Sequence, residues 1–157
     1  MAGVTGPSIR VAPARPADKE AWLRLWQAWQ SHMSGAVPVD VTDRTWRRAQ
    51  ENGGGLTILI GFTPEGEAVG FATVSLTFFA WTGADIAFLQ DLFVLDEARG
   101  KGAGDALLRA VYAHADAAGA AQVFWMVDEA DEKLHRFYGR NGVRTPYLRY
   151  MREPWPW

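Results

Sequence analysis

The chain has 157 residues, no cysteine and a formal net charge of -2. We expect one domain over residues 1–157, because this length can bury a substantial core. Without cysteine there is no disulfide, thiolate nucleophile or cysteine metal site. The charge balance argues against nucleic-acid binding driven by bulk charge. No signal-peptide pattern and no apolar run of ~20 residues is present, so we expect a cytoplasmic protein without a membrane partner.

The first half of the sequence predicts a strand, two helices and three successive strands. Residues 8–14 alternate and predict the first strand. A helix is expected after Pro16, because Trp22, Trp26, Trp29 and Met33 recur at helical spacing. A weaker helix follows from residue 41 and is stopped by the glycines at 53–55. Short β-branched and aromatic runs then predict strands at 56–62, 69–81 and 86–95.

The second half predicts two strand–helix units and a last strand. A helix is expected after the glycines near residue 100, running to about Ala118, followed by a strand at 121–127. A short helix closed by Gly142 comes next, and residues 147–153 predict the final strand. The order β-α-α-β-β-β-α-β-α-β indicates a mixed α/β domain rather than a doubly wound nucleotide-binding fold.

A glycine-rich turn joins the third long strand to its helix. Gly100, Gly102 and Gly104 alternate, with Arg99 and Lys101 beside them. A helix start presents unpaired backbone N–H groups and partial positive charge, and glycines let an anion approach them. The stretch lacks the Walker A pattern and the dinucleotide fingerprint. Two interpretations stay open at this point, a phosphate or pyrophosphate site and a plain strand–helix turn.

Two motifs resemble one enzyme family. The run "RGKGAG" matches the Q/R-x-x-G-x-G/A signature of the GNAT superfamily of acyl-CoA N-acyltransferases, and "LQDLFVLDEARGKGAG" is similar to its polyamine, thialysine and Hpa-type branches. The run "VFWMVDEADEKLHRFYGRNGV" resembles the family's second landmark. This resemblance implies an α/β fold with a mixed, mostly antiparallel sheet. The fourth and fifth strands would splay apart, and about four helices would flank the sheet.

The resemblance also implies acetyl-CoA as the co-substrate. Pantetheine would pair with the edge of the fourth strand, at Leu92, Phe93 and Val94. The diphosphate would meet the turn formed by Arg99, Gly100, Lys101, Gly102, Ala103, Gly104 and Asp105. Asp131 stands where the family has an asparagine that contacts CoA. As a carboxylate it accepts hydrogen bonds and caps a helix start, but it cannot donate when ionised.

The same resemblance assigns catalytic roles. Tyr138 matches the tyrosine that protonates the leaving thiolate, and a phenol is protonated at neutral pH as this role requires. Gln90 replaces the glutamate with which the polyamine branch binds its amine, so Asp91 and Glu129 are the acids expected to assist deprotonation. Asp128 and Trp81 are the further expected substrate contacts. The three histidines lack ligand spacing, so no metal is expected.

We therefore expect an N-acetyltransferase in which a small amine or a lysine-type acceptor attacks acetyl-CoA directly. The alternative is a non-catalytic acyl-CoA-binding sensor or interaction module, which the replacements at Gln90 and Asp131 would favour. A homodimer is expected as well. The chain after Gly142 has room for one good strand, at residues 147–153, and Trp155 and Trp157 add apolar surface that a second copy would cover.

Overall fold

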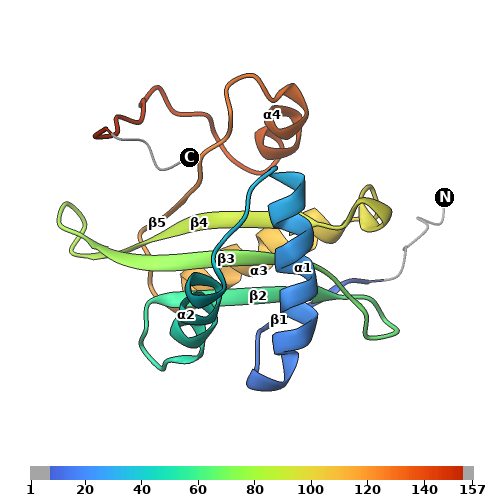
Figure 1. The fold of residues 1–157 in the computed structure, drawn as a ribbon. Coiled ribbons are helices and arrows are strands. Elements are labelled where there is room, and N and C mark those ends of the chain that lie inside the picture. The colour runs from blue at the N-terminus through green and yellow to red at the C-terminus, as the bar shows by residue number, and fades with distance from the viewer. Residues whose placement is uncertain (1–7, 154–157) are drawn as a thin grey trace. The chain divides into compact units, whose positions relative to one another are not determined.

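Five strands form one sheet in the order β1-β2-β3-β4-β5 in the computed structural model, which describes residues 8–153 (Figure 1). The first three junctions are antiparallel, whereas β4 and β5 run parallel. The prediction of a mixed, mostly antiparallel sheet is therefore confirmed. The strands are β1 (Arg10–Pro13), β2 (Leu56–Phe62), β3 (Ala68–Phe79), β4 (Ala84–Val94) and β5 (Gln122–Phe124).

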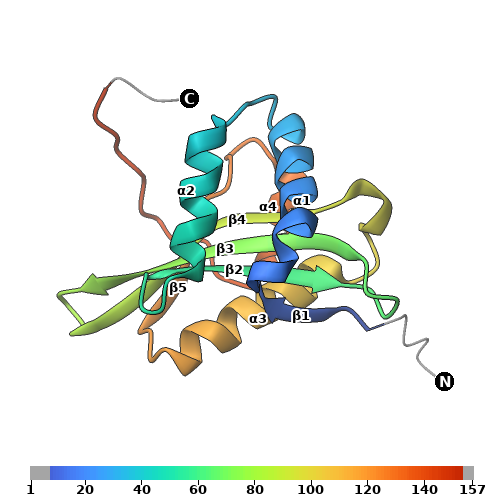
Figure 2. The ribbon, with the colours of Figure 1, turned by 60° about the horizontal axis from the view of Figure 1, so that its bottom comes forward.

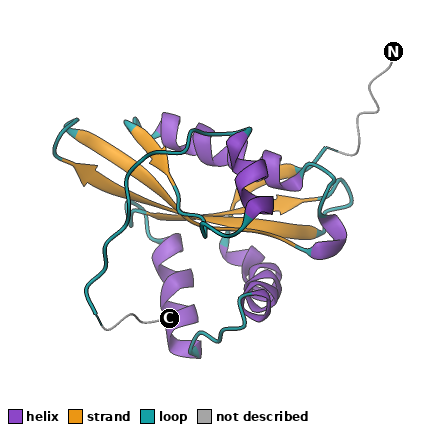
Figure 3. Cartoon of the chain, turned by 90° about the horizontal axis from the view of Figure 1, so that it is seen from above, coloured by secondary structure: helices purple, strands orange, loops and turns teal. Residues whose placement is uncertain are grey.

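The chain divides into two compact units, residues 1–125 and 126–157, and each is described by itself. The first unit holds the sheet, two single 3-10 turns, η1 (Pro16–Asp18) and η2 (Asp96–Ala98), and the helices α1 (Lys19–His32), α2 (Val39–Gln50) and α3 (Ala103–Ala117). Figure 2 shows α1 and α2 on one face of the sheet and α3 on the other. The same two layers of helices flank the strands when the sheet is seen from above (Figure 3).

Tryptophans build the core beneath α1 and α2. Trp22 is fully buried and stacks on Trp26, with ring centroids 5.3 Å apart. Trp46 of α2 packs against Trp22 at 5.0 Å, and the Trp26 indole N–H donates to Thr42 Oγ1 at 3.1 Å. The helical spacing of Trp22 and Trp26 thus predicted a buried face correctly. Trp46 belongs to this core too.

The opposite face of the sheet is covered by α3. Its buried residues are Ala103, Leu107, Leu108, Val111 and Ala115. Small residues of the sheet allow this close approach, as Gly70 illustrates. A Cβ at Gly70 would lie 2.5 Å from the Phe93 carbonyl oxygen and 3.1 Å from Leu107. The sheet is therefore buried on both faces, which accounts for the continuous apolar runs of β2 and β3.

The second unit contains α4 (Glu132–Gly139) and no strand among its described residues. The strand predicted at 147–153 is thus wrong for this chain alone. Strand-forming residues make a strand only when a neighbouring edge pairs with their backbone, and Pro146 removes one N–H at the start. Tyr147, Leu148 and Tyr150 are exposed instead. Trp155 and Trp157 lie outside the described residues. Across residues 8–153, no helix is long and apolar enough to cross a membrane.

Candidate active site

The ladder between β4 and β5 is short and leaves much of one edge of β4 open. Pairing runs only from Ile86 opposite Gln122 to Phe88 opposite Phe124. On its other side β4 stays paired with β3 as far as Val94. β4 therefore continues for six residues, Leu89 to Val94, beyond the end of the β5 ladder. This is the divergence of the fourth and fifth strands that the sequence predicted.

The pairing of β4 with β3 determines which backbone N–H and C=O groups of β4 point to the open edge. Leu95 N–H donates to the Val69 carbonyl at 2.9 Å. Bonded and non-bonded pairs alternate in an antiparallel ladder, so Phe93 also directs its peptide groups toward β3, while Leu92 and Val94 direct theirs to the open edge. Of the three residues expected to bind pantetheine, the structure brings two to that edge. The Phe93 side chain lies in the core, only 5% exposed.

A β-bulge in β4 places two successive polar side chains on one face. Val74 opposes Leu89 and Thr73 opposes Asp91, so Gln90 is the extra residue. Leu89 is buried with Val74 on the face that α3 covers, and Asp91 shares with Thr73 the face that α1 and α2 cover. Gln90 faces the same way as Asp91, because its Nε2 donates to Ser75 Oγ at 2.9 Å. The bulge thus brings an amide and a carboxyl side by side.

The environment of Asp91 changes the proton affinity of its carboxyl. Burial raises the pKa of its carboxyl to about 6. The Thr73 hydroxyl opposite favours the charged form and lowers that pKa, but it is the smaller influence. The influence of Thr73 is that of a hydroxyl donating toward the carboxylate, although Thr73 Oγ1 has no partner at full hydrogen-bonding geometry. A carboxylate with such a pKa is ionised at neutral pH yet accepts a proton readily.

The glycine-rich turn at the end of β4 adopts the conformation that only glycine accepts easily. Gly100 has φ +72° and Gly102 has φ +85°, and Gly102 is the N-cap of α3. A Cβ at either position would meet no atom within 4 Å, so the backbone, not crowding, requires glycine. The start of α3 consequently carries no side chain at its cap. Its first-turn N–H groups, from Ala103 to Asp105, have the geometry that accepts an anion.

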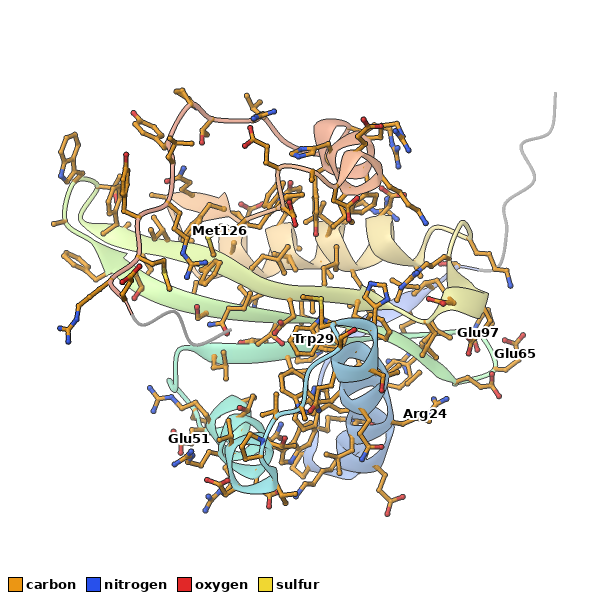
Figure 4. All side chains as sticks on the ribbon, turned by 45° about the horizontal axis from the view of Figure 1, so that its top comes forward. Arg24, Trp29, Glu51, Glu65, Glu97 and Met126 are labelled. Atoms are coloured by element: carbon orange, nitrogen blue, oxygen red, sulfur yellow. The ribbon has the colours of Figure 1, made fainter. Side chains whose placement is uncertain are left out.

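The charged side chains of this turn serve its structure. Arg99 Nε donates to the Val94 carbonyl at 3.0 Å, and its Nη1 pairs with Asp96 at 2.7 Å. Lys101 Nζ donates to the Glu97 carbonyl at 2.9 Å. Glu97 extends from this turn in Figure 4. Asp96 pairs with Arg99, and Lys101 is held by a backbone carbonyl, so the attraction for an anion rests on the helix start more than on these cations. The residues present fit a diphosphate in this way.

The remaining expected residues of the second unit surround α4. Tyr138 is half-buried near the end of the helix, with its ring 4.9 Å from that of Phe137 in an edge-on arrangement. Asp131 caps the helix, because its Oδ1 accepts from Leu134 N–H at 2.9 Å. Asp128 accepts from Ala130 N–H at 2.9 Å, and Glu129 forms an exposed ion pair with Arg144 at 3.0 Å. These three carboxylates hold local structure.

A hollow of about 700 Å³ opens on the α2 side of the sheet. Trp81, an expected substrate contact, lies in the turn between β3 and β4 with 92% of its surface exposed. The hollow is lined by Thr45, Arg48, Gly53, Gly54, Gly55, Leu56, Ser75, Leu76, Asp85 and Gln90. Sequence reasoning missed all of these as site residues except Gln90. The alternation of Thr73, Ser75 and Thr77 within an apolar strand was the available signal for a polar stripe on β3.

The model of the Acetyltransferase (GNAT) family matches residues 19–143 of the chain. The chain belongs to this GNAT family. It is 30% identical to the D-amino-acid N-acetyltransferase HPA3 of Saccharomyces cerevisiae over 92% of its own length and 90% of that protein. It is 32% identical to the aminoglycoside N(6')-acetyltransferase type 1 of Klebsiella aerogenes over 64% of this chain and 66% of that one.

Solved GNAT structures share the fold at low sequence identity. A probable acetyltransferase superimposes with a TM-score of 0.80 at 16% identity, covering 90% of this chain and 95% of that one. The aminoglycoside acetyltransferase AAC(6')-Iy, solved with the bisubstrate analogue CoA-S-monomethyl-acetylneamine, gives 0.79 at 20% identity, covering 93% and 98%. The family match and the shared fold confirm the resemblance that the two sequence motifs indicated. GNAT acetyltransferases take their acetyl group from acetyl-CoA.

Proposed function

We propose that this GNAT protein transfers an acetyl group from acetyl-CoA to the primary amine of a small molecule or a lysine side chain. The observation that carries the proposal is the arrangement along β4. The bulge presents Asp91, the open edge of Leu92 and Val94 follows, and the bare helix start at Gly102 comes next. β4 and the turn after it would therefore supply, in this order, a proton acceptor, a backbone edge and an anion site.

Acetyl-CoA supplies the thioester whose carbonyl carbon the amine attacks. Leu92 and Val94 would hold pantetheine by backbone hydrogen bonds, as an added strand is held. Since the Val94 carbonyl already accepts from Arg99, Leu92 and the Val94 N–H are the groups left for this pairing. The N–H groups at the start of α3 would hold the diphosphate.

Asp91 is proposed as the general base. An amine of pKa ~10 is mostly an ammonium ion at pH 7 and must lose one proton before it attacks, and a second as the amide forms. The pKa of the nitrogen falls steeply as the new N–C bond forms. A carboxylate with a pKa of about 6 then takes up that proton favourably. Glu129 is less suited to act as the general base, because it is exposed and forms an ion pair with Arg144.

Tyr138 is proposed as the general acid. When the C–S bond breaks, the leaving sulfur carries the electron pair, and a phenol can donate the proton that makes it a thiol. In the balance of the reaction, one N–C bond forms and one C–S bond breaks. Two protons leave the ammonium in total: one balances the proton that Tyr138 gives to the thiolate, and the other is released to water. Family resemblance at the second motif supports this role for Tyr138, which is half-buried on α4.

A homodimer is part of the proposal. Residues 147–153 have strand-forming character and no strand in the described chain, and Tyr147 and Tyr150 are 87% and 90% exposed. Pairing with the same segment of a second copy would satisfy this backbone and cover these rings. Sedimentation at micromolar concentration tests the dimer. A mass of 17.4 kDa, unchanged when the residues after Arg152 are deleted, would contradict it.

Thiol release tests the enzymatic proposal against the non-catalytic alternative. Acetyl-CoA is incubated with the protein and a panel of amines and lysine peptides, and free CoA thiol is followed. The proposal expects multiple turnovers that require an amine. A stoichiometric CoA complex without thiol release would identify an acyl-CoA-binding module instead.

A further inference from the structure

The hollow beside α2 begins at Gln90, next to the proposed base Asp91. Gln90, which lines it, is followed directly by Asp91, and the bulge directs both side chains to the same face. From Gln90 the lining continues through Ser75 of β3 to Leu56 of β2. An amine placed at Asp91 can therefore extend the rest of its molecule into this hollow.

Three successive glycines keep one wall of the hollow free of side chains. Gly53 and Gly55 have φ of +73° and +70°. A Cβ at Gly54 would lie 2.8 Å from the Arg48 carbonyl oxygen, so this backbone packs tightly against the end of α2. A side chain at Gly54 would clash there, whereas Cβ atoms at Gly53 and Gly55 would meet nothing closer than 3.5 Å. The wall thus offers room and backbone polar groups next to Arg48.

The charged residues of the hollow suit a ligand that carries both a positive and a negative charge. Among the described residues that line it, Arg48 is the one cation and Asp85 the one acid, and the rest are neutral. A polycationic acceptor needs several carboxylates and would be repelled by Arg48. An amino acid at neutral pH carries one carboxylate in addition to its amine. Leu56 and Leu76 add apolar surface for a side chain.

Arg48 can turn to a ligand without breaking a buried contact. Its Nη1 pairs with Glu51 Oε2 at 3.1 Å, but the two side chains are 60% and 56% exposed. Such an exposed pair is weak, because water screens it. Glu51 extends from the end of α2 in Figure 4. The guanidinium has five donors, so it can bind an incoming carboxylate in bidentate fashion and still keep or release Glu51.

We propose that the acceptor is an amino acid, and that Arg48 binds its carboxylate in this hollow while its amine faces Gln90 and Asp91. This inference rests on the proposed acetyltransferase function. The D-amino-acid N-acetyltransferase among the relatives is consistent with it. Arg48 is then a specificity-determining residue, which distinguishes amino acids from amines that lack a carboxylate.

The test compares an amino acid with its own amide. Acetyl-CoA turnover is measured with D- and L-phenylalanine and with the two phenylalaninamides, using wild type, Arg48→Gln and Arg47→Gln. Arg47 is the matched control, since it precedes Arg48 on α2, is exposed and does not line the hollow. Thermal unfolding of each variant shows whether it is folded.

We expect Arg48→Gln to lower kcat/KM for the preferred phenylalanine by ~10- to 100-fold, the usual effect of losing a charge-assisted hydrogen bond. Its kcat/KM for the amide should stay unchanged, and Arg47→Gln should behave as wild type with both. Equal losses on acid and amide, or no loss on the acid, would overturn the role of Arg48 while leaving the acetyltransferase proposal intact. Absence of turnover with every amine, by contrast, would overturn the acetyltransferase proposal itself and this inference with it.

Discussion

Asp91 lies directly opposite Thr73 in the ladder between β3 and β4, one residue past the bulge at Gln90. Thr73 is 2% exposed, so the carboxyl of the half-buried Asp91 lies opposite a buried hydroxyl. Burial raises the pKa of Asp91 and the Thr73 hydroxyl partly offsets that effect. This environment suits the proposed role of Asp91 as a base at neutral pH.

Removing the Thr73 hydroxyl should move the acidic limb of the pH–rate profile. Thr73→Val keeps the shape of the side chain but deletes the dipole that favours ionised Asp91. The pKa of Asp91 should rise, and kcat/KM should fall off at a higher pH than in wild type. Thr73→Ser, which restores a hydroxyl, should return the limb toward its original position. A limb that stays in place in Thr73→Val would show that this hydroxyl does not act on Asp91.

Replacing Asp91 should make the folded protein more stable above pH 6, although it should lower the catalytic activity. Below about pH 4 this carboxyl is protonated both folded and unfolded and has no effect on stability. As the pH rises through 6, the folded state must ionise a buried group, at a cost of up to about 3 kcal/mol. Asp91→Asn should therefore raise the free energy of unfolding in urea at about pH 8 but not at about pH 4. A destabilised variant at both pH values would contradict the assigned environment.

Filling the helix start should abolish CoA binding. Gly102→Glu adds bulk and a negative charge where the diphosphate is proposed to lie, so calorimetry should show a large loss of affinity. The matched control is Gly66→Glu in the turn between β2 and β3. Gly66 also has positive φ, +91°, and an added Cβ there meets nothing within 4 Å, so the backbone strain is the same. If Gly102→Glu bound CoA as well as this control, the diphosphate site would have to be elsewhere.

Deleting the Tyr138 hydroxyl should slow turnover without weakening CoA binding. Tyr138→Phe keeps the ring that packs edge-on against Phe137. Loss of one general acid typically costs ~10²–10⁴-fold in rate. Turnover and calorimetric CoA affinity are measured on the same preparation. An unchanged kcat with a good amine would leave Tyr138 a structural role only.

The sequence was informative where local pattern and local structure coincide. The tryptophan spacing of α1, the glycine turn before α3 and the order of the elements follow from helix and strand periodicity. The bulge depends on how β3 pairs with β4, although the adjacent polar residues Gln90 and Asp91 in an apolar strand were a hint of it. Arg48 and the glycines at 53–55 gain meaning only when α2 folds over β2 and β3. Pairing also decides whether residues 147–153 form a strand, and no local propensity contains that information.

The pH dependence of product formation in wild type and Asp91→Asn tests the central claim most directly. N-acetylated amine is quantified by mass spectrometry with released CoA thiol, between about pH 5 and 8. The account predicts equal amounts of product and thiol in wild type, and a kcat/KM that rises with pH through about 6, where Asp91 ionises. In Asp91→Asn the rate should be much lower, without that acidic limb. An undiminished rate or the same limb in the variant, or thiol release without acetylated product, would contradict the account.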